Sequence, residues 1–193
     1  MRARLAGATD LPVSADFENG FGDEAEYVAG TIRLAADAGL VGCTIEDAMK
    51  GKDNLIYPFE AAVARVGATV AAADALGFAF YLTRRCENFL RGNTDLDDTI
   101  RELKGFEDAG AEVLMASGLP DREAVKTVCS ALSKPFNFMA GIPGWACDVA
   151  SLRASGVRRI SLARLSMRQR KPATKTHPDL SKRVCPRRTW TDS

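Results

Sequence analysis

Apolar and polar residues follow two alternating patterns along the chain. Six short runs are almost continuously apolar, as in buried strands, and between them lie five longer segments with apolar residues every three or four positions, as in helices. In the first helical segment Val28 and Ile32 share one face, and Gly39 ends the pattern. The predicted strands are 11–17, 40–48, 78–86, 111–117, 134–141 and 157–163. The predicted helices are 24–39, 58–77, 95–110, 121–133 and 145–156.

This order of elements predicts an α/β fold. Strands that are apolar on both faces and alternate with helices are typical of parallel sheets. Two architectures fit, a doubly wound sheet and a (β/α) barrel of the TIM type. A nucleotide-binding sheet normally offers a GxGxxG or P-loop motif after its first strand. Here the first strand is followed by "ENGFGD", which has glycines but the wrong charge for a phosphate cradle.

Charge is unevenly distributed over the 193 residues, a length that suits one domain with a buried core. Residues 164–193 contain nine Lys and Arg against two Asp, a net charge of +7, so the total of +1 leaves −6 for residues 1–163. The apolar pattern also stops after residue 163. We therefore expect a folded body over 1–163 and a basic, disordered tail over 164–193.

Several function classes are disfavoured by composition. No apolar run approaches the roughly 18–20 residues of a membrane span, and the N-terminus lacks the apolar core of a secretory signal. The five cysteines are scattered without CxxC spacing, which argues against a zinc site or disulfide framework and favours the cytoplasm. A basic tail can bind nucleic acid, but Trp190 is its one aromatic residue, so a solvated tail is favoured.

Charged and polar residues gather where the predicted strands end. They are Asp16, Glu18, Glu46, Asp47, Arg84, Arg85, Glu87, Asn88, Ser117 and Asn137. In a parallel barrel the carboxyl ends of the strands share one mouth, so these side chains are expected to meet there. Residues two apart on a strand face the same side, which predicts that Asp16 and Glu18 point into the mouth together, joined by Glu46.

This residue set suggests metal and carboxylate chemistry. Three carboxylates without a nearby histidine or thiolate suit Mg²⁺ or Mn²⁺ better than Zn²⁺. Arg85 could hold a substrate carboxylate through a bidentate fork. Some acids have a structural alternative: Asp23 is predicted to cap helix 24–39, and Asp47 could cap a helix or pair with a lysine. The single histidine, His177, lies in the tail, which disfavours serine–histidine and cysteine–histidine schemes.

Four motifs in this order resemble the isocitrate lyase / phosphoenolpyruvate mutase superfamily, in particular its carboxyvinyl-carboxyphosphonate phosphorylmutase-like group. They read "LPVSADFENGFGD", "GLVGCTIEDA", "YLTRRCENFL" and "GAEVLMASGLPD", and the similarity runs from Arg4 to Ala163. The resemblance implies a (β/α)8 barrel that binds Mg²⁺ and a small 2-oxo or enolpyruvyl acid. It also implies a reaction that makes or breaks a C–C or P–C bond beside the carboxylate, through a metal-stabilised enolate or oxyanion.

The resemblance also implies roles for single residues. Asp16, Glu18 and Glu46 match the acids that hold the metal, in part through bound water. Arg85 matches the arginine that grips the substrate carboxylate, and Arg85 and Glu46 are expected to be catalytic. The residues expected to contact substrate are Arg85, Glu87, Asn137 and Ser117. Ser117 stands where relatives carry His, Glu or Pro.

The segment 48–58, "AMKGKDNLIYP", matches the gating loop of the superfamily. Isocitrate and methylisocitrate lyases carry a catalytic cysteine there, and this loop has none. Cys43 lies in the preceding strand and is expected in the core. A mutase-like or hydrolase-like reaction is therefore favoured over a cysteine-dependent lyase. Lys50, Lys52 and Asn54 are candidate contacts to the leaving group, or else solvate a mobile lid.

The motif that begins the third strand in the superfamily starts here at residue 11, so the resemblance covers strands three to eight of eight. An incomplete barrel of six β/α units would have two exposed strand edges. We expect a marginally stable chain with little or no activity. The alternative is a non-catalytic subunit that pairs with an intact paralogue, and a homo-oligomer is also open. A nucleic-acid binder would act through residues 164–193.

Overall fold

The computed structural model describes residues 6–51, 55–142 and 147–162. The predicted tail 164–193 and the loop residues Lys52 and Asn54 lie outside the described residues. Six strands alternate with five α-helices in the described part, as the apolar pattern predicted. The strands are β1 Ser14–Asp16, β2 Gly42–Glu46, β3 Tyr81–Cys86, β4 Val113–Ala116, β5 Asn137–Ala140 and β6 Arg159–Leu162. The helices are α2 Ala25–Asp37, α3 Phe59–Asp74, η1 Asn88–Arg91 (3-10), α4 Leu96–Asp108, α5 Arg122–Ala131 and α6 Val149–Ala154.

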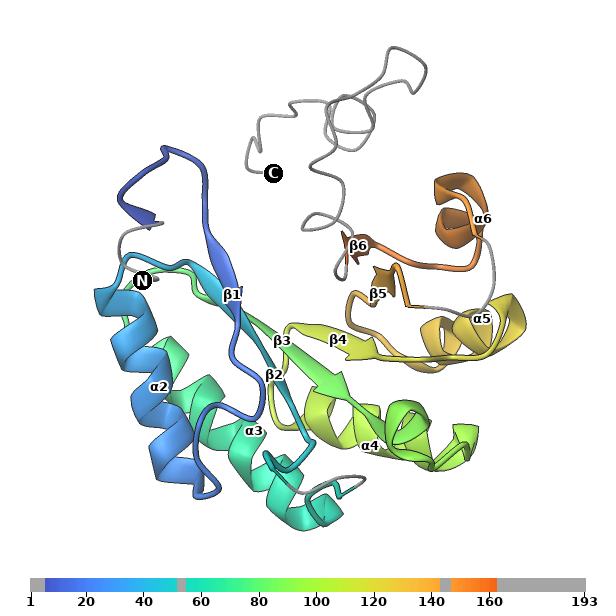
Figure 1. The fold of residues 1–193 in the computed structure, drawn as a ribbon, viewed down its shortest axis with the longest axis horizontal. Coiled ribbons are helices and arrows are strands. Elements are labelled where there is room, and N and C mark those ends of the chain that lie inside the picture. The colour runs from blue at the N-terminus through green and yellow to red at the C-terminus, as the bar shows by residue number, and fades with distance from the viewer. Residues whose placement is uncertain (1–5, 52–54, 143–146, 163–193) are drawn as a thin grey trace. The chain divides into compact units, whose positions relative to one another are not determined.

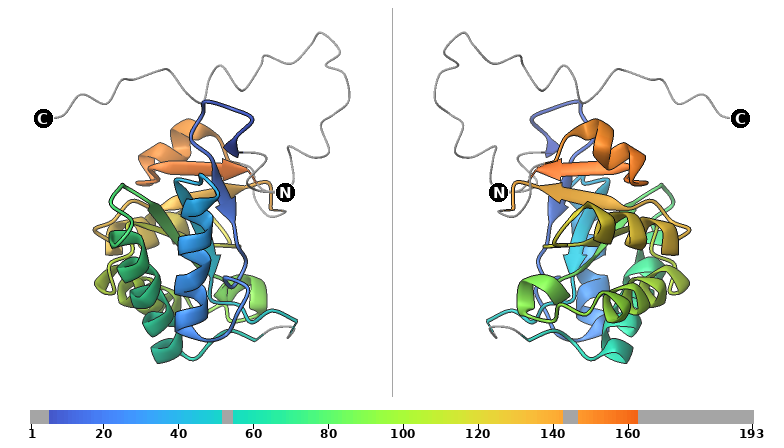
Figure 2. Two further views of the ribbon diagram at one scale, coloured as in Figure 1. Left: turned by 90° about the vertical axis from the view of Figure 1, so that its left-hand side faces the viewer. Right: turned by 90° about the vertical axis from the view of Figure 1, so that its right-hand side faces the viewer.

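The strands form one curved parallel row. Strands β1 to β4 pair in sequence order, as do β5 and β6, and a bridge between Leu114 and Phe136 joins the two groups. The helices lie along the outer side of this row (Figure 1; Figure 2). Within the described residues β1 pairs only with β2 and β6 only with β5, so the row has the two open edges expected of an incomplete barrel.

Two apolar clusters hold the helices on the strands. One lies between α2, α3 and the first three strands and includes Val28, Ile32 and Cys43, so Cys43 is a core residue as expected. The other joins α3, α4 and α5 to the later strands around Leu103, Phe106 and other buried residues. Buried alanines along α3 allow close helix packing. None of the described helices is long and apolar enough to span a membrane.

Local signals set the starts of several helices. Asp95 caps α4 by accepting hydrogen bonds from the backbone amides of Asp97 and Asp98, and Asp121 and Asp148 cap α5 and α6 in the same way. Helix α2 differs, because its N-cap residue is Glu24 and no side chain caps it. The prediction that Asp23 caps this helix is therefore wrong, since its carboxylate is held elsewhere.

Candidate active site

The carboxyl ends of β1, β2 and β3 bring an arginine together with three acids. Glu46 on β2 lies opposite Arg85 on β3 in the parallel register, and Asp16 ends β1 on the other side of β2. The Arg85 guanidinium lies 3.0 Å from the Asp16 carboxylate and 2.9 Å from that of Glu87, and it also contacts Glu46. The Arg85 side chain is 10% exposed. One buried cation is thus surrounded by three carboxylates from neighbouring strand ends.

Glu18 lies at the site through a backbone turn and not, as predicted, through its place on a strand. Strand β1 ends at Asp16, and Glu18 has a left-handed backbone with φ of 52°. Its N–H donates to the Asp16 carboxylate at 3.0 Å, which makes an Asx-type turn. The prediction that strand alternation aligns Asp16 and Glu18 is therefore wrong. The Glu18 carboxylate instead pairs with Lys50 Nζ at 2.7 Å.

A buried arginine on α3 anchors the loop that carries Glu18. The Arg65 guanidinium donates to the backbone carbonyls of Asn19, Gly22 and Asp23. It also stacks over the ring of Tyr57, 4.1 Å from the centroid. Burial lowers the pKa of Arg65. The glycine-rich turn "ENGFGD" is thus held by its backbone carbonyls against a cation, which is the opposite of a phosphate cradle.

The carboxylate of Asp23 lies in the same anchor. It accepts a hydrogen bond of 2.5 Å from the hydroxyl of Tyr57. The Asn19 amide also donates to that hydroxyl, at 2.9 Å. Burial, and then the bond to Asp23, raises the pKa of Tyr57. Asp23 therefore joins the loop to the start of α3, and this long-range bond replaces its predicted role as a helix cap.

A pocket of about 490 Å³ opens beside the arginine. Its lining residues are Glu18, Glu46, Met49, Lys50, Gly51, Arg85, Glu87 and Arg91. Arg91 was not singled out from the sequence: it ends the 3-10 turn η1, and its guanidinium lies 3.8 Å from the Glu46 carboxylate. The spacing from Glu87 to Arg91 could have indicated it, since one helical turn after a strand end returns a side chain to the same region.

Asn137 and Ser117, which were predicted to contact substrate, are not among the residues given as lining this pocket. The Asn137 side chain is fully buried, where it donates to Ser161 at 3.0 Å and accepts from Arg159 at 3.0 Å. Ser117 is 1% exposed, and its hydroxyl has no hydrogen-bond partner among the described residues. Asn137 therefore links β5 to β6 here. The substrate-binding roles of Asn137 and Ser117 stay predictions.

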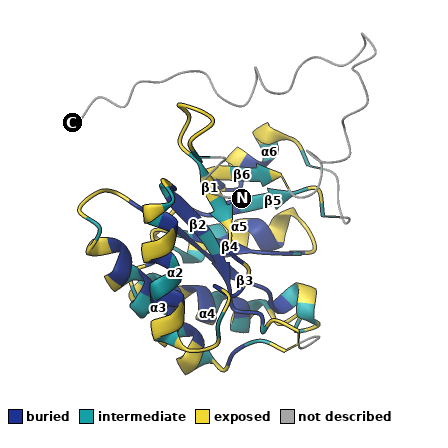
Figure 3. Cartoon of the chain, turned by 60° about the vertical axis from the view of Figure 1, so that its left-hand side comes forward, coloured by how far each residue is buried: buried dark blue, intermediate teal, exposed yellow. Residues whose placement is uncertain are grey.

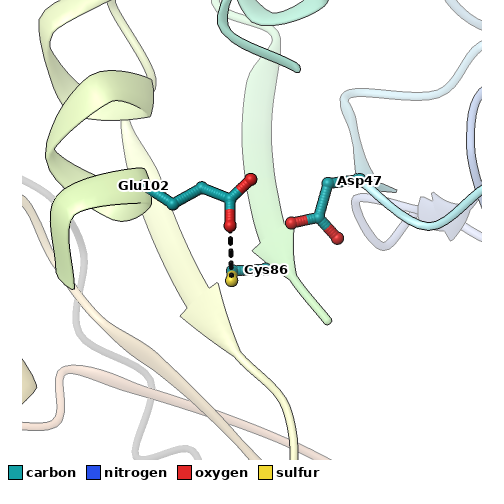
Figure 4. Close-up of side chains that lie close together, drawn as sticks. All are labelled: Asp47, Cys86 and Glu102. Atoms are coloured by element: carbon teal, nitrogen blue, oxygen red, sulfur yellow. Dashed lines mark hydrogen bonds between the residues drawn. The ribbon is translucent and has the colours of Figure 1, made fainter. Parts of the chain in front are cut away.

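Behind the strand ends lies a second, buried acidic cluster. Ligand atoms of Asp47, Cys86 and Glu102 all lie within 4.8 Å of one another (Figure 4). The Cys86 thiol donates to Glu102 at 3.3 Å, and one Asp47 oxygen accepts from the Glu87 N–H at 2.9 Å. Burial raises the pKa of Asp47, Cys86 and Glu102 alike. Within residues 6–51, 55–142 and 147–162 Asp47 is given neither a helix-capping bond nor a lysine partner, and Cys86 is held as a thiol.

The residue set at the mouth fits a divalent cation. Asp16, Glu18 and Glu46 are not preassembled around one point, because the described structure engages them with Arg85 and Lys50. However, the acids at the mouth outnumber its cations by one: four carboxylates face three positive charges. The acids are Asp16, Glu18, Glu46 and Glu87, and the cations are Lys50, Arg85 and Arg91. Hard carboxylate oxygens with that excess charge are the ligands that Mg²⁺ and Mn²⁺ prefer. The role of these acids as metal ligands stays a prediction.

Parallel strands that bring an arginine and several acids together at their carboxyl ends are typical of an α/β protein of the (β/α) barrel class, here with an incomplete barrel. The chain belongs to the phosphoenolpyruvate phosphomutase family, whose profile matches residues 1–177. It is 33% identical over 165 residues to an oxaloacetate decarboxylase of Paraburkholderia xenovorans, covering 80% of this chain and 52% of that protein. The chain thus spans about half the length of the curated relatives it matches.

Solved structures also resemble this chain in fold. A candidate lyase/mutase from Burkholderia cenocepacia has a TM-score of 0.81 at 50% identity, with 83% of this chain and 58% of that chain covered. A phosphonopyruvate hydrolase in complex with oxalate and Mg²⁺ has a TM-score of 0.71 at 22% identity, with 84% and 57% covered, which supports the fold alone. The superfamily resemblance and the incomplete barrel predicted from the sequence are both confirmed.

Proposed function

We propose that the mouth binds a divalent metal, Mg²⁺ or Mn²⁺, together with a small 2-oxo or enolpyruvyl acid, and acts on a C–C or P–C bond beside the carboxylate. This proposal rests on the position of Arg85. Its guanidinium lies among the carboxylates of Asp16, Glu46 and Glu87, beside a pocket of about 490 Å³. The name of the relative from Paraburkholderia xenovorans, an oxaloacetate decarboxylase, supports the substrate class.

Each side chain has a distinct part in this proposal. Asp16, Glu18 and Glu46 would hold the metal, which when bound stabilises negative charge that develops on a substrate oxygen. Arg85 presents a planar fork that suits a carboxylate, and its acidic neighbours fix the orientation of that fork. Burial of Arg85 keeps water away and strengthens its electrostatic interaction with an anion.

The rim supplies two further cations. Lys50 sits at the base of the loop 48–58, which is tied by the Ala48–Ile56 bridge and by a bond of 2.9 Å from the Met49 N–H to the Leu55 carbonyl. Lys50 and Arg91 both line the pocket, so we assign them to the leaving group or to a second anionic group of the substrate. Cys86 is excluded as a nucleophile, because burial raises the pKa of its thiol and keeps it protonated.

Oxalate, a small dicarboxylate, is a direct probe of this site. Titration calorimetry of the full chain should detect oxalate binding with Mg²⁺ present and none after the metal is chelated. Asp16→Ala should abolish the metal-dependent binding, whereas the exposed Asp37→Ala on α2 should leave it unchanged. Binding of oxalate that is indifferent to Mg²⁺ and to Asp16 would refute the metal-dependent proposal. Turnover of oxaloacetate and phosphonopyruvate under the same conditions then tests the reaction.

A second function is favoured by one observation. Strand β1 has a partner on one side only in the described residues, and the chain spans about half of its curated relatives. A non-catalytic subunit that completes itself with another chain, either a full-length homologue or a second copy, would cover that edge. Oxalate binding without turnover by the purified chain would support this role over the enzymatic one.

A further inference from the structure

The ammonium group of Lys50 has two neighbours in the glycine-rich turn that follows β1. Its Nζ lies 2.7 Å from the carboxylate of Glu18 and 5.3 Å from the centroid of the Phe21 ring. The first contact is an ion pair and the second is a cation–π contact. Lys50 and Glu18 both line the pocket at the mouth. The positive charge of Lys50 is thus held at the pocket by two independent contacts.

The ion pair of Glu18 is more exposed than that of Glu46. The side chains of Lys50 and Glu18 are 58% and 53% exposed, whereas those of Arg85 and Glu46 are 10% and 9% exposed. Strands β2 and β3, which carry Glu46 and Arg85, are buried (dark blue in Figure 3). An exposed ion pair is weak, because water screens both charges and both side chains lose freedom. Glu18 can therefore exchange its cation at a lower cost than Glu46.

The ring of Phe21 is fixed beside Lys50 by a strained turn. Phe21 has φ of 66°, a left-handed conformation that a bulky residue rarely adopts. Its N–H donates to the side-chain oxygen of Asn19 at 3.1 Å, and its ring centroid lies 5.6 Å from that of the buried Phe17. Such strain persists only where surrounding contacts enforce it, and it gathers at functional sites. The ring is therefore a firm support for the Lys50 ammonium.

The sign of the charge at the mouth depends on a bound divalent cation. The four carboxylates and three basic side chains of the mouth leave an excess of one negative charge. A divalent cation would change this to an excess of one positive charge. A small anionic acid is repelled by the first arrangement and attracted by the second.

We infer that Lys50 is an exchangeable counter-ion of Glu18: its ammonium leaves Glu18 when that carboxylate binds the divalent metal, and it stays at the mouth on the ring of Phe21 to meet the anionic substrate. Lys50 thereby favours one order of binding, the metal first and the acid second. Phe21 is a positioning residue, because it acts through Lys50. This inference rests on the proposed metal site.

Binding of Mn²⁺ alone to the full chain measures the competition between Lys50 and the metal. Electron paramagnetic resonance detects the free ion and gives its dissociation constant. Lys50→Met should bind Mn²⁺ roughly two- to fivefold more tightly than the wild type, which is the size of an exposed ion pair. Lys50→Arg keeps the charge and should resemble the wild type. Lys126→Met, at an exposed position of α5, is the control and should have no effect.

Oxalate binding at saturating Mn²⁺ tests the second half of the inference. Lys50→Met should now bind more weakly than the wild type, so the same change improves metal binding and impairs anion binding. Phe21→Leu keeps an apolar side chain but removes the ring, and oxalate should bind it roughly two- to fivefold more weakly, as expected for an exposed cation–π contact. Phe21→Tyr should restore the affinity. A general loss of structure would not give this rescue.

Chemical labelling of Lys50 follows its release from Glu18 without any turnover. Acetylation by acetic anhydride is quantified by mass spectrometry, with Lys126 in the same sample as the internal reference. Saturating Mn²⁺ should speed the labelling of Lys50, because its amine is then no longer engaged by the carboxylate. Glu18→Gln should label equally fast with no metal present.

The remaining outcomes separate this inference from the proposed function. Mn²⁺ binding that Lys50→Met leaves unchanged or weakens, or Lys50 labelling that saturating Mn²⁺ does not alter, would overturn the inference while the metal site stands. Oxalate binding that is unchanged in Phe21→Leu would remove the role of Phe21. Mn²⁺ binding to neither the wild type nor Lys50→Met would overturn the proposed function, and the inference with it. Mn²⁺ binding to Lys50→Met but not to the wild type would support the inference.

Discussion

The guanidinium of Arg85 on β3 lies 3.0 Å from the carboxylate of Asp16 at the end of β1, although the two residues are 69 positions apart. Strand β2 lies between their strands and contributes Glu46 to the same guanidinium. The ion pair therefore depends on the order and register of three parallel strands. It fixes the arginine at the mouth before any substrate is bound.

Arg85→Lys should separate the role of the planar fork from that of the positive charge. Lysine keeps the charge but cannot form the paired bonds to a carboxylate. We expect Mg²⁺-dependent oxalate binding to weaken roughly 10- to 100-fold, the range for lost hydrogen bonds to a charged group. Calorimetric titration measures this directly. Arg101→Lys on the exposed side of α4 is the control, and equal losses in both variants would remove Arg85 from the site.

Arg65→Met should loosen the loop that carries Glu18. The change removes the donor to three backbone carbonyls, of which that of Asn19 is buried, and leaves them without this partner. We expect the free energy of unfolding to fall by about 2–4 kcal/mol, as when other buried hydrogen-bond networks are broken. Urea denaturation gives this value. The exposed Arg153→Met on α6 should change it by less than about 0.5 kcal/mol, and a similarly small effect of Arg65→Met would contradict the anchoring role.

Arg84→Met should stabilise the protein. Arg84 is fully enclosed, two of its nitrogens have no hydrogen-bond partner among the described residues, and burial lowers its pKa to about 10. Replacing such a buried charge with an apolar side chain of similar length is expected to raise the free energy of unfolding by about 1–3 kcal/mol. Arg158→Met, on the surface before β6, is the comparison. A loss of stability in Arg84→Met would indicate a partner that the described contacts lack.

Glu102 should make stability depend on pH. Burial raises its pKa above the ordinary value of 4.5, within a cluster that also contains Asp47 and Cys86 and has Asp98 and Arg101 nearby. The folded protein therefore keeps a proton that the unfolded chain releases just above pH 4.5. The free energy of unfolding consequently falls as the pH rises from that value.

Glu102→Gln removes this titration, so its free energy of unfolding should fall less than that of the wild type between pH 4.5 and 7. Thermal or urea unfolding across the range tests the sign. The exposed Glu123→Gln on α5 should follow the wild-type profile. A steeper fall in the Glu102 variant than in the wild type would show that this carboxyl is ionised and stabilised in the folded state.

Much of the fold could be read from local sequence. The apolar runs and the three- to four-residue spacing located the six strands and the five α-helices α2 to α6 of the described residues. They did so because alternation and helical period depend on neighbouring residues and on backbone sterics. The ends were less well placed: the strand predicted over 11–17 spans Ser14–Asp16. Pairing needs a partner strand, which local pattern does not specify.

The sequence by itself determined the fold class, the family and the gathering of Asp16, Glu46, Arg85 and Glu87, because parallel strands bring their carboxyl ends to one mouth whatever the details of packing. Only the tertiary structure decided which acidic side chain forms an ion pair with which basic side chain. For example, Glu18 adopts a left-handed backbone conformation, and its carboxylate forms an ion pair with Lys50. Such partners are chosen by strand register and by contacts between residues far apart in the chain, for which a single sequence carries no local signal.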